Sequence, residues 1–254
     1  MALLSLEGVT RRFGGLAAVA DLTVAAEPGA VTGLIGPNGA GKTTVVNLVT
    51  GLLALSGGRI TFEGRDISAL PPHEVAAAGI ARTFQNIRLL PEQTVSANVL
   101  IGCYRHAVAS PLACLLGLPS AWRGRTAALA QVEALLERFG MAQMADYPAG
   151  ALSYGHQRRV EIMRALASRP RLLLLDEPVA GMNDVEAAAI AAIMRELAAE
   201  GMTLLLIEHN LRFVGATCRV VHVLDAGRLI ASGSPAEVTA DSAVIEAYLG
   251  RAAA

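Results

Sequence analysis

The stretch VTGLIGPNGAGKTT, residues 31–44, decides the fold of this chain. A short apolar run, typical of a buried strand, leads into a turn with glycine at positions 36, 39 and 41, and residues 42–44 then begin a helix. Glycine lets such a turn curl its main-chain N–H groups around an anion, and the positive end of the helix dipole favours negative charge at the same place. The stretch therefore predicts a phosphate-binding loop between a strand and a helix.

Lys42 strengthens this prediction because it is the only lysine among the 21 basic residues of the chain. An ammonium is a compact charge that reaches the outer phosphates of a nucleotide, whereas a rigid guanidinium fork fits such a loop poorly. The Thr43 hydroxyl stands where a magnesium ligand is needed. The alternative is a glycine turn that meets a lysine by chance. We predict that nucleotide phosphates are bound by Gly36, Pro37, Asn38, Gly39, Ala40, Gly41, Lys42, Thr43 and Thr44.

A second chemical element is RLLLLDEP, residues 171–178. Its four leucines predict a buried strand, and Asp176 and Glu177 follow at the carboxyl end, where open α/β sheets bind ligands. There, Asp176 suits the coordination shell of Mg²⁺ beside Thr43, and Glu177 suits the group that polarises the water attacking the γ-phosphate. By itself, this segment is better explained as a solvated turn that ends a strand. Paired with the phosphate loop, it predicts nucleotide hydrolysis.

The composition excludes several other classes of protein. The 254 residues include 21 basic and 22 acidic side chains, and a net charge of −1 gives no support to nucleic-acid binding. Hydrophobic residues make up 53% of the chain, but no run reaches the about 18 apolar residues of a membrane-spanning helix. Residues 107–122 come nearest and contain two prolines. No secretory signal opens the chain. The three cysteines have no metal-binding spacing, and their odd number argues against a disulfide framework, so we expect a cytosolic protein.

The order of strand and helix signals predicts an α/β fold with a helical insertion. Two strands around a glycine turn at residues 13–15 suggest an antiparallel flap. Strand and helix signals alternate up to residue 85, with a strand expected at 79–84, and alternate again from residue 168. Between them, helical signals dominate at 94–101, 123–139 and 153–167. We predict one domain, with an α/β core and flap at 1–85 and 168–254 and a helical subdomain at 86–167.

These motifs, in this order, resemble the nucleotide-binding subunit of ATP-binding cassette (ABC) transporters, and the resemblance covers nearly the whole chain. It is carried by the phosphate loop, TFQN at 83–86, LSYGHQRR at 152–159, LLLLDEP at 172–178 and LLIEHN at 205–210. The resemblance implies a P-loop NTPase core, ATP and Mg²⁺ as ligands, and ATPase activity. Phe13 occupies the position where the family has an aromatic residue that stacks on the adenine of ATP. The alternative role for Phe13 is packing in the hydrophobic core.

Three further site residues follow from the resemblance. Gln85 matches the glutamine that contacts Mg²⁺ or the attacking water, and it precedes the helical insertion. His209 matches the histidine that contacts the γ-phosphate, so the implied catalytic residues are Glu177, His209 and Gln85. The implied metal ligands are Thr43, Gln85 and Asp176. Asn183 occupies the position where the family usually has aspartate. An asparagine keeps the ability to form hydrogen bonds there but lacks the negative charge.

The stretch LSYGH, residues 152–156, matches the family's signature loop, usually LSGGQ. We expect Ser153 to be the N-cap of the following helix, whose N–H groups then point at a phosphate. In this family that phosphate belongs to ATP on another protomer, so Ser153, Tyr154, Gly155 and His156 imply a two-fold dimer with shared sites. The chain departs from the usual motif at Tyr154 and His156. Three arginines that follow, at positions 158, 159 and 164, are interpreted as a solvated helix face.

Further segments resemble the branch of the family that serves high-affinity branched-chain amino acid importers. These are RRFGGLAAV, VEIMRALA, PVAGMN, IEHN and VIEAYLG, together with the apolar insertion at 107–122. The branch implies a peripheral subunit on the cytoplasmic face of the inner membrane. Its implied partners are a second cassette, identical or not, two membrane permease subunits in contact with the helical insertion and, indirectly, a solute-binding protein.

Other functions stay open on the sequence. Related cassettes serve urea or amide import and lipopolysaccharide export. A soluble cassette ATPase of DNA repair or translation fits less well with the single cassette, the near-neutral charge and the lack of a long coiled-coil arm. A scaffold that binds nucleotide without hydrolysis fits poorly with Asp176, Glu177 and His209. The sequence does not name the transported solute.

Overall fold

The computed structural model describes residues 2–107 and 119–249, which form two compact units. Unit 1 contains residues 1–82, 171–178 and 187–254, and unit 2 contains residues 83–170 and 179–186. The units differ from the predicted core and insertion by a few residues and by the assignment of 179–186 to unit 2. The predicted organisation as one domain with a subdomain stays a prediction.

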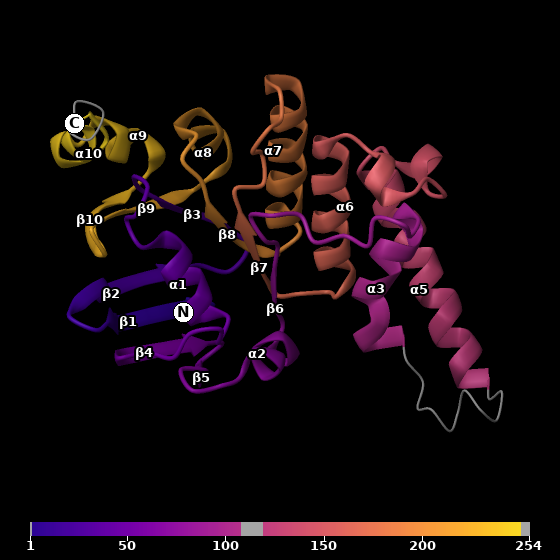
Figure 1. Ribbon diagram of the computed structural model, residues 1–254, viewed down its shortest axis with the longest axis horizontal. Coiled ribbons are helices and arrows are strands. Elements are labelled where there is room, and N and C mark those ends of the chain that lie inside the picture. Colours follow the sequence, from indigo (N-terminus) through magenta and orange to yellow (C-terminus); the bar gives the residue numbers. More distant parts are fainter. Residues whose placement is uncertain (1, 108–118, 250–254) are drawn as a thin grey trace. The chain divides into compact units, whose positions relative to one another are not determined.

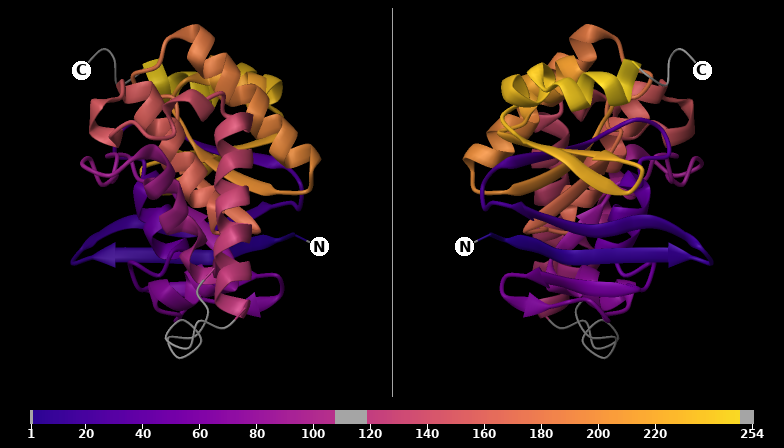
Figure 2. Two further views of the ribbon diagram at one scale, coloured as in Figure 1. Left: turned by 90° about the vertical axis from the view of Figure 1, so that its right-hand side faces the viewer. Right: turned by 90° about the vertical axis from the view of Figure 1, so that its left-hand side faces the viewer.

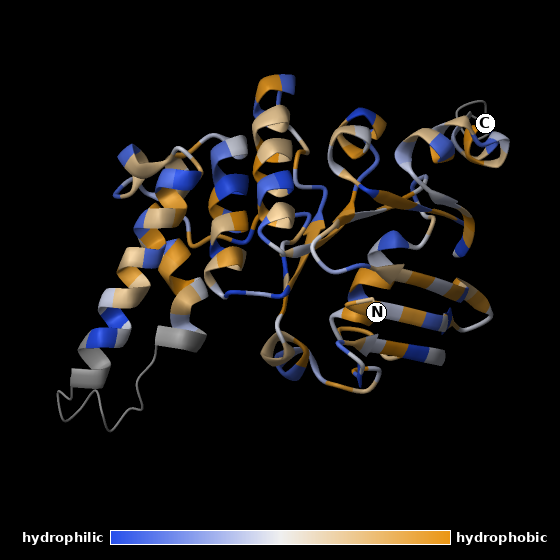
Figure 3. Cartoon of the chain, turned by 180° about the vertical axis from the view of Figure 1, so that it is seen from behind, coloured by the Kyte–Doolittle hydropathy of each residue, from blue (hydrophilic) through white to orange (hydrophobic). Residues whose placement is uncertain are grey.

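Unit 1 contains a six-stranded sheet in the order β10-β9-β3-β8-β7-β6. Strands β3, β6, β7, β8 and β9 pair in parallel, and β10 is an antiparallel edge strand. Every residue of β3, β7 and β8 is buried, which explains their nearly continuous apolar sequences (Figure 3). The bounds are Val31–Ile35 for β3, Ile80–Arg82 for β6, Leu172–Asp176 for β7, Thr203–Ile207 for β8, Val220–Asp225 for β9 and Arg228–Gly233 for β10.

A second, antiparallel sheet of unit 1 has the order β2-β1-β4-β5 and forms a separate layer from the six-stranded sheet (Figure 2). Helix α1, Lys42–Val49, lies between the two layers, and its valines join leucines of both sheets in one hydrophobic core (Figure 1). This arrangement fixes the start of α1, and with it the loop at 36–41. The strands are Leu4–Phe13 for β1, Leu16–Ala26 for β2, Gly57–Phe62 for β4 and Arg65–Asp66 for β5.

The remaining helices of unit 1 cover the sheet or follow its last strands. They are α2, Pro72–Ala78; α8, Leu211–Thr217; α9, Pro235–Ala240; and α10, Ser242–Leu249. Helix α7, Asp184–Ala199, begins in unit 2 and continues in unit 1. Pro235 at the first turn and a capping box between Ser234 and Glu237 start α9.

Unit 2 is helical, with α3, α5 and α6 packed on one another (Figure 1). Helix α3 is Val95–Ala107, α5 is Pro119–Arg138 and α6 is Tyr154–Ala167, with short 3₁₀ turns at Ala142–Met144 and Ala149–Ala151. Gly102 allows α3 to approach α6 closely, because a Cβ at this position would lie 2.0 Å from the Arg164 carbonyl oxygen. Helix α6 carries the predicted signature loop at its N-terminal end.

The predicted α/β fold with an antiparallel sheet and a helical insertion is confirmed, and several boundaries are corrected. The strand expected at 79–84 ends at Arg82, and α8, α9 and α10 were not predicted. Most of the apolar insertion at 107–122 lies outside the described residues. Within the described ranges, every helix is too short or too polar to cross a membrane.

Candidate functional site

The strand order of unit 1 brings three predicted motifs to one edge of the sheet. Strand β3 leads into the glycine loop and pairs with β8, and β8 pairs with β7. Because the three strands are parallel, their carboxyl ends meet, so the loop at 36–41 lies near the residues that follow β7 and β8. Asp176 is the last residue of β7 and Glu177 follows it, and Glu208 and His209 come directly after β8.

The glycine loop has the backbone that a phosphate cradle needs. Gly36 and Gly41 have φ values of 148° and 102°, which disfavour other residues. A Cβ at Gly36 would lie 2.1 Å from the Leu224 carbonyl oxygen, and one at Gly41 would lie 2.5 Å from that of Ala18. Gly41 is also the N-cap of α1, so the N–H groups of the first helical turn are available to an anion. Asn38 and Gly39 are exposed.

Lys42 is buried, with 8% of its surface exposed, and folds back on the loop. Its Nζ donates to the carbonyl oxygens of Gly36 at 2.7 Å and Pro37 at 3.0 Å. Burial lowers the pKa of Lys42, and the negative charges of Glu177 and Asp176 oppose this shift. The single lysine of the chain therefore lies in the electric field of both predicted carboxylates.

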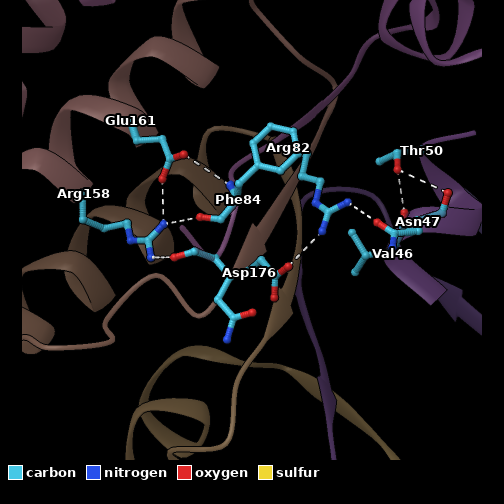
Figure 4. A network of polar contacts seen from close by, with 9 residues as sticks. Val46, Asn47, Thr50, Arg82, Phe84, Arg158, Glu161 and Asp176 are labelled. Carbon is cyan, nitrogen blue, oxygen red and sulfur yellow. Dashed lines mark hydrogen bonds and ion pairs between the residues drawn. The ribbon is translucent and has the colours of Figure 1, made fainter. Parts of the chain in front are cut away.

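Asp176 is 3% exposed and takes part in a buried ion pair that was not predicted from the sequence. Arg82, the last residue of β6, donates through Nη2 to Asp176 Oδ2 at 3.0 Å (Figure 4). Nη1 of the same guanidinium donates to Asn47 Oδ1 in α1 at 2.5 Å. Arg82 thereby ties strand β7 to the helix that follows the glycine loop.

Glu177 has a left-handed backbone, with φ 49°, which is costly for a residue other than glycine. Its main-chain N–H donates to Ile207 of β8 at 2.9 Å, and this bond holds the conformation. His209 Nδ1 lies 3.4 Å from Glu177 Oε1, and the imidazole is 58% exposed. Glu208 is buried and accepts from the N–H groups of His209 and Asn210, which fixes the turn that presents His209.

Two of the predicted magnesium ligands belong to unit 1: the buried carboxylate of Asp176 and the hydroxyl of Thr43, which is exposed in the first turn of α1. Among the described residues, no group of three or more His, Cys, Asp or Glu side chains is arranged to hold a metal by itself. Mg²⁺ is commonly bound by one or two protein oxygens plus substrate phosphates, so this donor set fits that ion.

Phe13 ends β1 and is 46% exposed, so core packing does not account for it. The guanidinium of Arg11 lies 4.6 Å from its ring centroid. A residue near the loop that the sequence reasoning missed is Tyr248 of α10. Burial raises the pKa of Tyr248, and the main chain of Gly36 opposes this shift.

The signature loop lies in unit 2, at the start of α6. Ser153 is the N-cap, as predicted, and its Oγ lies 3.5 Å from the His156 N–H and 3.0 Å from His156 Nδ1. A Cβ at Gly155 would lie 3.0 Å from Glu186 Oε1, so a larger residue here would displace the end of the flexible Glu186 side chain. Asn183 caps the start of α7 by accepting from the N–H groups of Val185 and Glu186.

The interpretation of Arg158 as part of a solvated face is wrong. Its side chain is completely buried, and its guanidinium contacts the main chain of Phe84 and Gln85 and the carboxylate of Glu161. Arg159 and Arg164 are half-buried. Burial lowers the pKa of Arg164, and the Glu161 carboxylate opposes the shift. Gln85 is exposed and belongs to unit 2, with the signature loop, whereas the glycine loop belongs to unit 1.

A glycine cradle at a helix start, a lysine, and paired carboxylates at the carboxyl end of a strand in the same parallel sheet define the chain as a P-loop ATPase. The model of the ABC transporter family matches residues 19–180, and a model described as branched-chain amino acid ATP-binding cassette transporter matches residues 228–254. The chain belongs to the ABC transporter family and is an ATP-binding subunit with ATPase activity.

Relatives match along almost the whole chain. The high-affinity branched-chain amino acid transport ATP-binding protein BraF of Pseudomonas aeruginosa is 41% identical, and LivG of Escherichia coli, with the same description, is 39% identical. The lipopolysaccharide export system ATP-binding protein LptB of Haemophilus influenzae is 34% identical. In each case the match covers 98% of both chains.

Solved structures agree with this assignment. A nucleotide-free ATP-binding cassette from an ABC transporter superposes with a TM-score of 0.85 at 35% identity, covering 98% of this chain and 99% of that one. An ATP-binding cassette in its ADP conformation gives a TM-score of 0.84 at 36% identity, with the same coverage. As a member of this family, the chain works with membrane components of a transporter.

Proposed function

We propose that this chain is the ATP-hydrolysing subunit of an importer that takes up branched-chain amino acids across the inner membrane. The relatives described as branched-chain amino acid transport proteins, at 39–41% identity, exceed the lipopolysaccharide export relative at 34% over the same coverage. The match at residues 228–254 points in the same direction. The chain works as a peripheral subunit on the cytoplasmic face of the membrane.

The observation that carries hydrolysis is the pair formed by Glu177 and His209. Glu177 holds a costly backbone conformation, and its carboxylate lies 3.4 Å from His209 Nδ1 at the sheet edge that carries the glycine loop. Glu177 accepts a hydrogen bond from the water that attacks the γ-phosphate, and His209 donates to that phosphate.

The glycine loop and its neighbours bind and orient ATP. The N–H groups of residues 36–44 surround the phosphates, Phe13 stacks on the adenine, and Lys42 exchanges its bonds to the Gly36 and Pro37 carbonyls for bonds to phosphate oxygens. Thr43 and Asp176 would hold Mg²⁺, with Gln85 as the further ligand that the family resemblance implies, and the bound ion would neutralise charge on the phosphates. These residues restrain ATP in the geometry for in-line attack.

A second cassette completes each ATP site. Ser153, Tyr154, Gly155 and His156 of one protomer contact the ATP bound by the other, and the N-terminal end of α6 supplies N–H groups and a favourable dipole. Two permease subunits bind the helical unit, and a solute-binding protein delivers the amino acid to them. We expect no nucleic acid to take part in this cycle.

The test is the substitution Glu177→Gln, which keeps the shape of the side chain and removes its charge. We expect the ATPase rate of the purified protein to fall about 10²- to 10⁴-fold, while ATP still binds, because the general base is lost. Uptake of labelled leucine by cells that carry the importer should fall to the level of cells that lack this chain.

The matched control is Glu246→Gln, which removes an exposed carboxylate on α10. A normal ATPase rate in the Glu177→Gln protein would refute the role of Glu177. Normal leucine uptake by cells that lack this chain would refute the transport assignment and leave the ATPase assignment standing.

A further inference from the structure

Arg158 is the largest fully buried side chain of the described residues, and it lies in the first half of α6. Its Nη1 donates to the Phe84 carbonyl oxygen at 2.5 Å, and its Nη2 donates to the Gln85 carbonyl oxygen at 2.6 Å (Figure 4). One guanidinium therefore holds two consecutive carbonyl groups of a segment that is neither helix nor strand. Only the planar fork of arginine has donors spaced for this task.

Glu161, one helical turn further along, completes the contact. Its Oε2 accepts from Arg158 Nη1 at 2.6 Å, and its Oε1 accepts from the Phe84 N–H at 3.3 Å. Both polar groups of the Phe84 main chain are therefore bonded to this one ion pair. The carboxylate is 2% exposed, so water does not compete with these bonds. We call Arg158, Glu161 and the main chain of Phe84 and Gln85 the arginine clamp.

Stability alone is a weak explanation for the clamp, because well-packed apolar side chains replace a buried ion pair without loss in many proteins. What apolar side chains cannot do is fix the position of main-chain carbonyl and N–H groups. The clamp sets where the segment at 84–85 lies against α6. It also explains why the strand expected at 79–84 ends at Arg82: the polar groups of the Phe84 main chain bond to side chains of α6 instead of to a neighbouring strand.

Tyr154 connects the clamp to the signature loop. Its hydroxyl accepts from Arg158 Nη2 at 3.1 Å, and the guanidinium carbon lies 5.7 Å from its ring centroid. The ring also packs against Gly181, where a Cβ would lie 3.1 Å from Tyr154 Cδ1. The tyrosine that departs from the usual signature sequence therefore gives the loop a side-chain contact with Arg158.

We propose that Arg158 and Glu161 are positioning residues that make the signature loop and the Gln85 segment move as one body. The signature loop serves the ATP of the partner protomer, and Gln85 serves the chain's own ATP. The clamp thereby couples the two ATP sites of the dimer within one protomer. This proposal rests on the proposed function for the roles of Ser153, Gly155 and Gln85. The clamp itself rests on the contacts above.

The first measurement is amide hydrogen exchange of residues 83–86 in the full chain. The variants are Arg158→Lys, which keeps the charge but lacks the fork, and the double variant Arg158→Met with Glu161→Leu, which leaves no unpaired buried charge. We expect exchange of the Phe84 amide to rise about tenfold or more in both, with no change in α1. Wild-type protection of Phe84 in the folded double variant would overturn the clamp.

The second measurement separates positioning from a structural role. Affinity for ATP at equilibrium should stay within about twofold of the wild type, whereas kcat should fall about tenfold to 10²-fold, because Gln85 is misplaced. The matched control is Arg159→Lys, since Arg159 makes one 3.4 Å bond to the Phe139 carbonyl oxygen and none to the segment at 84–85. Its kcat should equal that of the wild type.

Two results would overturn the coupling. One is a wild-type kcat in a variant whose Phe84 amide exchanges rapidly, and the other is an equal loss of ATP affinity and kcat. Failure of the proposed function has a different signature, because leucine uptake would then be normal in cells that lack this chain, while the exchange experiment still reports on the clamp.

Discussion

Each of the two units buries an arginine–carboxylate pair, and the two pairs differ in what else the arginine holds (Figure 4). In unit 1, Arg82 contacts the side chains of Asp176 and Asn47. In unit 2, Arg158 contacts two main-chain carbonyl groups in addition to Glu161. A carboxylate side chain can change its rotamer and bind another cation in place of the arginine. A main-chain carbonyl group can move only together with the backbone of its segment. The ion pair of unit 1 is therefore suited to releasing Asp176 for a metal ion. The ion pair of unit 2 is suited to making the segment at 84–85 move together with α6.

The largest effect on stability should come from Arg158→Met. This change leaves Glu161 charged and buried without its partner, and such losses cost about 3–5 kcal/mol. The free energy of unfolding from denaturant titration measures the loss. The double variant with Glu161→Leu should recover most of it, because no buried charge is left. A double variant as unstable as the single one would show that the packing of Arg158, and not its charge, matters.

The substitution Arg82→Met should lower the free energy of unfolding by less, about 1–3 kcal/mol, because Asp176 and Asn47 lose a charged donor. Mg²⁺ together with a non-hydrolysable ATP analogue should reduce this loss, since the cation replaces Arg82 as the partner of Asp176. The same addition should leave the loss of Arg158→Met unchanged. Denaturant titrations with and without the ligand compare the two variants. Equal rescue of both would remove the distinction between the two pairs.

The smallest effect on stability concerns His222, a buried side chain of unit 1 whose two ring nitrogens contact uncharged groups. Its ring nitrogens lie 2.9 Å from Ser232 Oγ and 3.1 Å from the Ala25 carbonyl oxygen. Burial lowers the pKa of His222 below its ordinary value, and the bond to Ala25 opposes this shift. The unfolded chain therefore takes up the proton first as pH falls.

Stability should consequently fall as pH drops below about 6.5, by at most about 1.4 kcal/mol per pH unit, and this loss should be smaller in His222→Gln. Denaturant titrations between pH 5 and pH 8 measure both slopes. The same pH dependence in the two proteins would show that other groups cause it.

Much of the site was predictable from local sequence. The loop at 36–42 needs glycine wherever its backbone is left-handed or crowded, and the buried strands β7 and β8 are continuous apolar runs. The capping box at Ser234 was also readable, and its sequence SPAE would have revealed α9. The ion pairs were not readable in this way. Arg82 and Asp176 are 94 residues apart, and Arg158 and Phe84 are 74 apart.

Arg158 shows why sequence pattern failed at unit 2. An arginine and a glutamate three residues apart on a helix usually form a solvated pair, and two more arginines nearby favour the same interpretation. The segment at 84–85, distant in sequence, contacts the pair and contributes to its burial. A helical pattern describes one face of one element and contains no information about the chain that covers it.

The sequence by itself determined that this chain binds nucleotide phosphates and belongs to a class of ATPases, because a glycine loop with a following lysine fixes its own local geometry. Only the tertiary structure decided which residues support that chemistry. Arg82 beside Asp176, the left-handed Glu177 beside His209, and the arginine clamp all depend on elements distant in sequence. The physical reason is that burial, which makes a charge costly unless it is paired, is a property of the packed molecule and not of the residue.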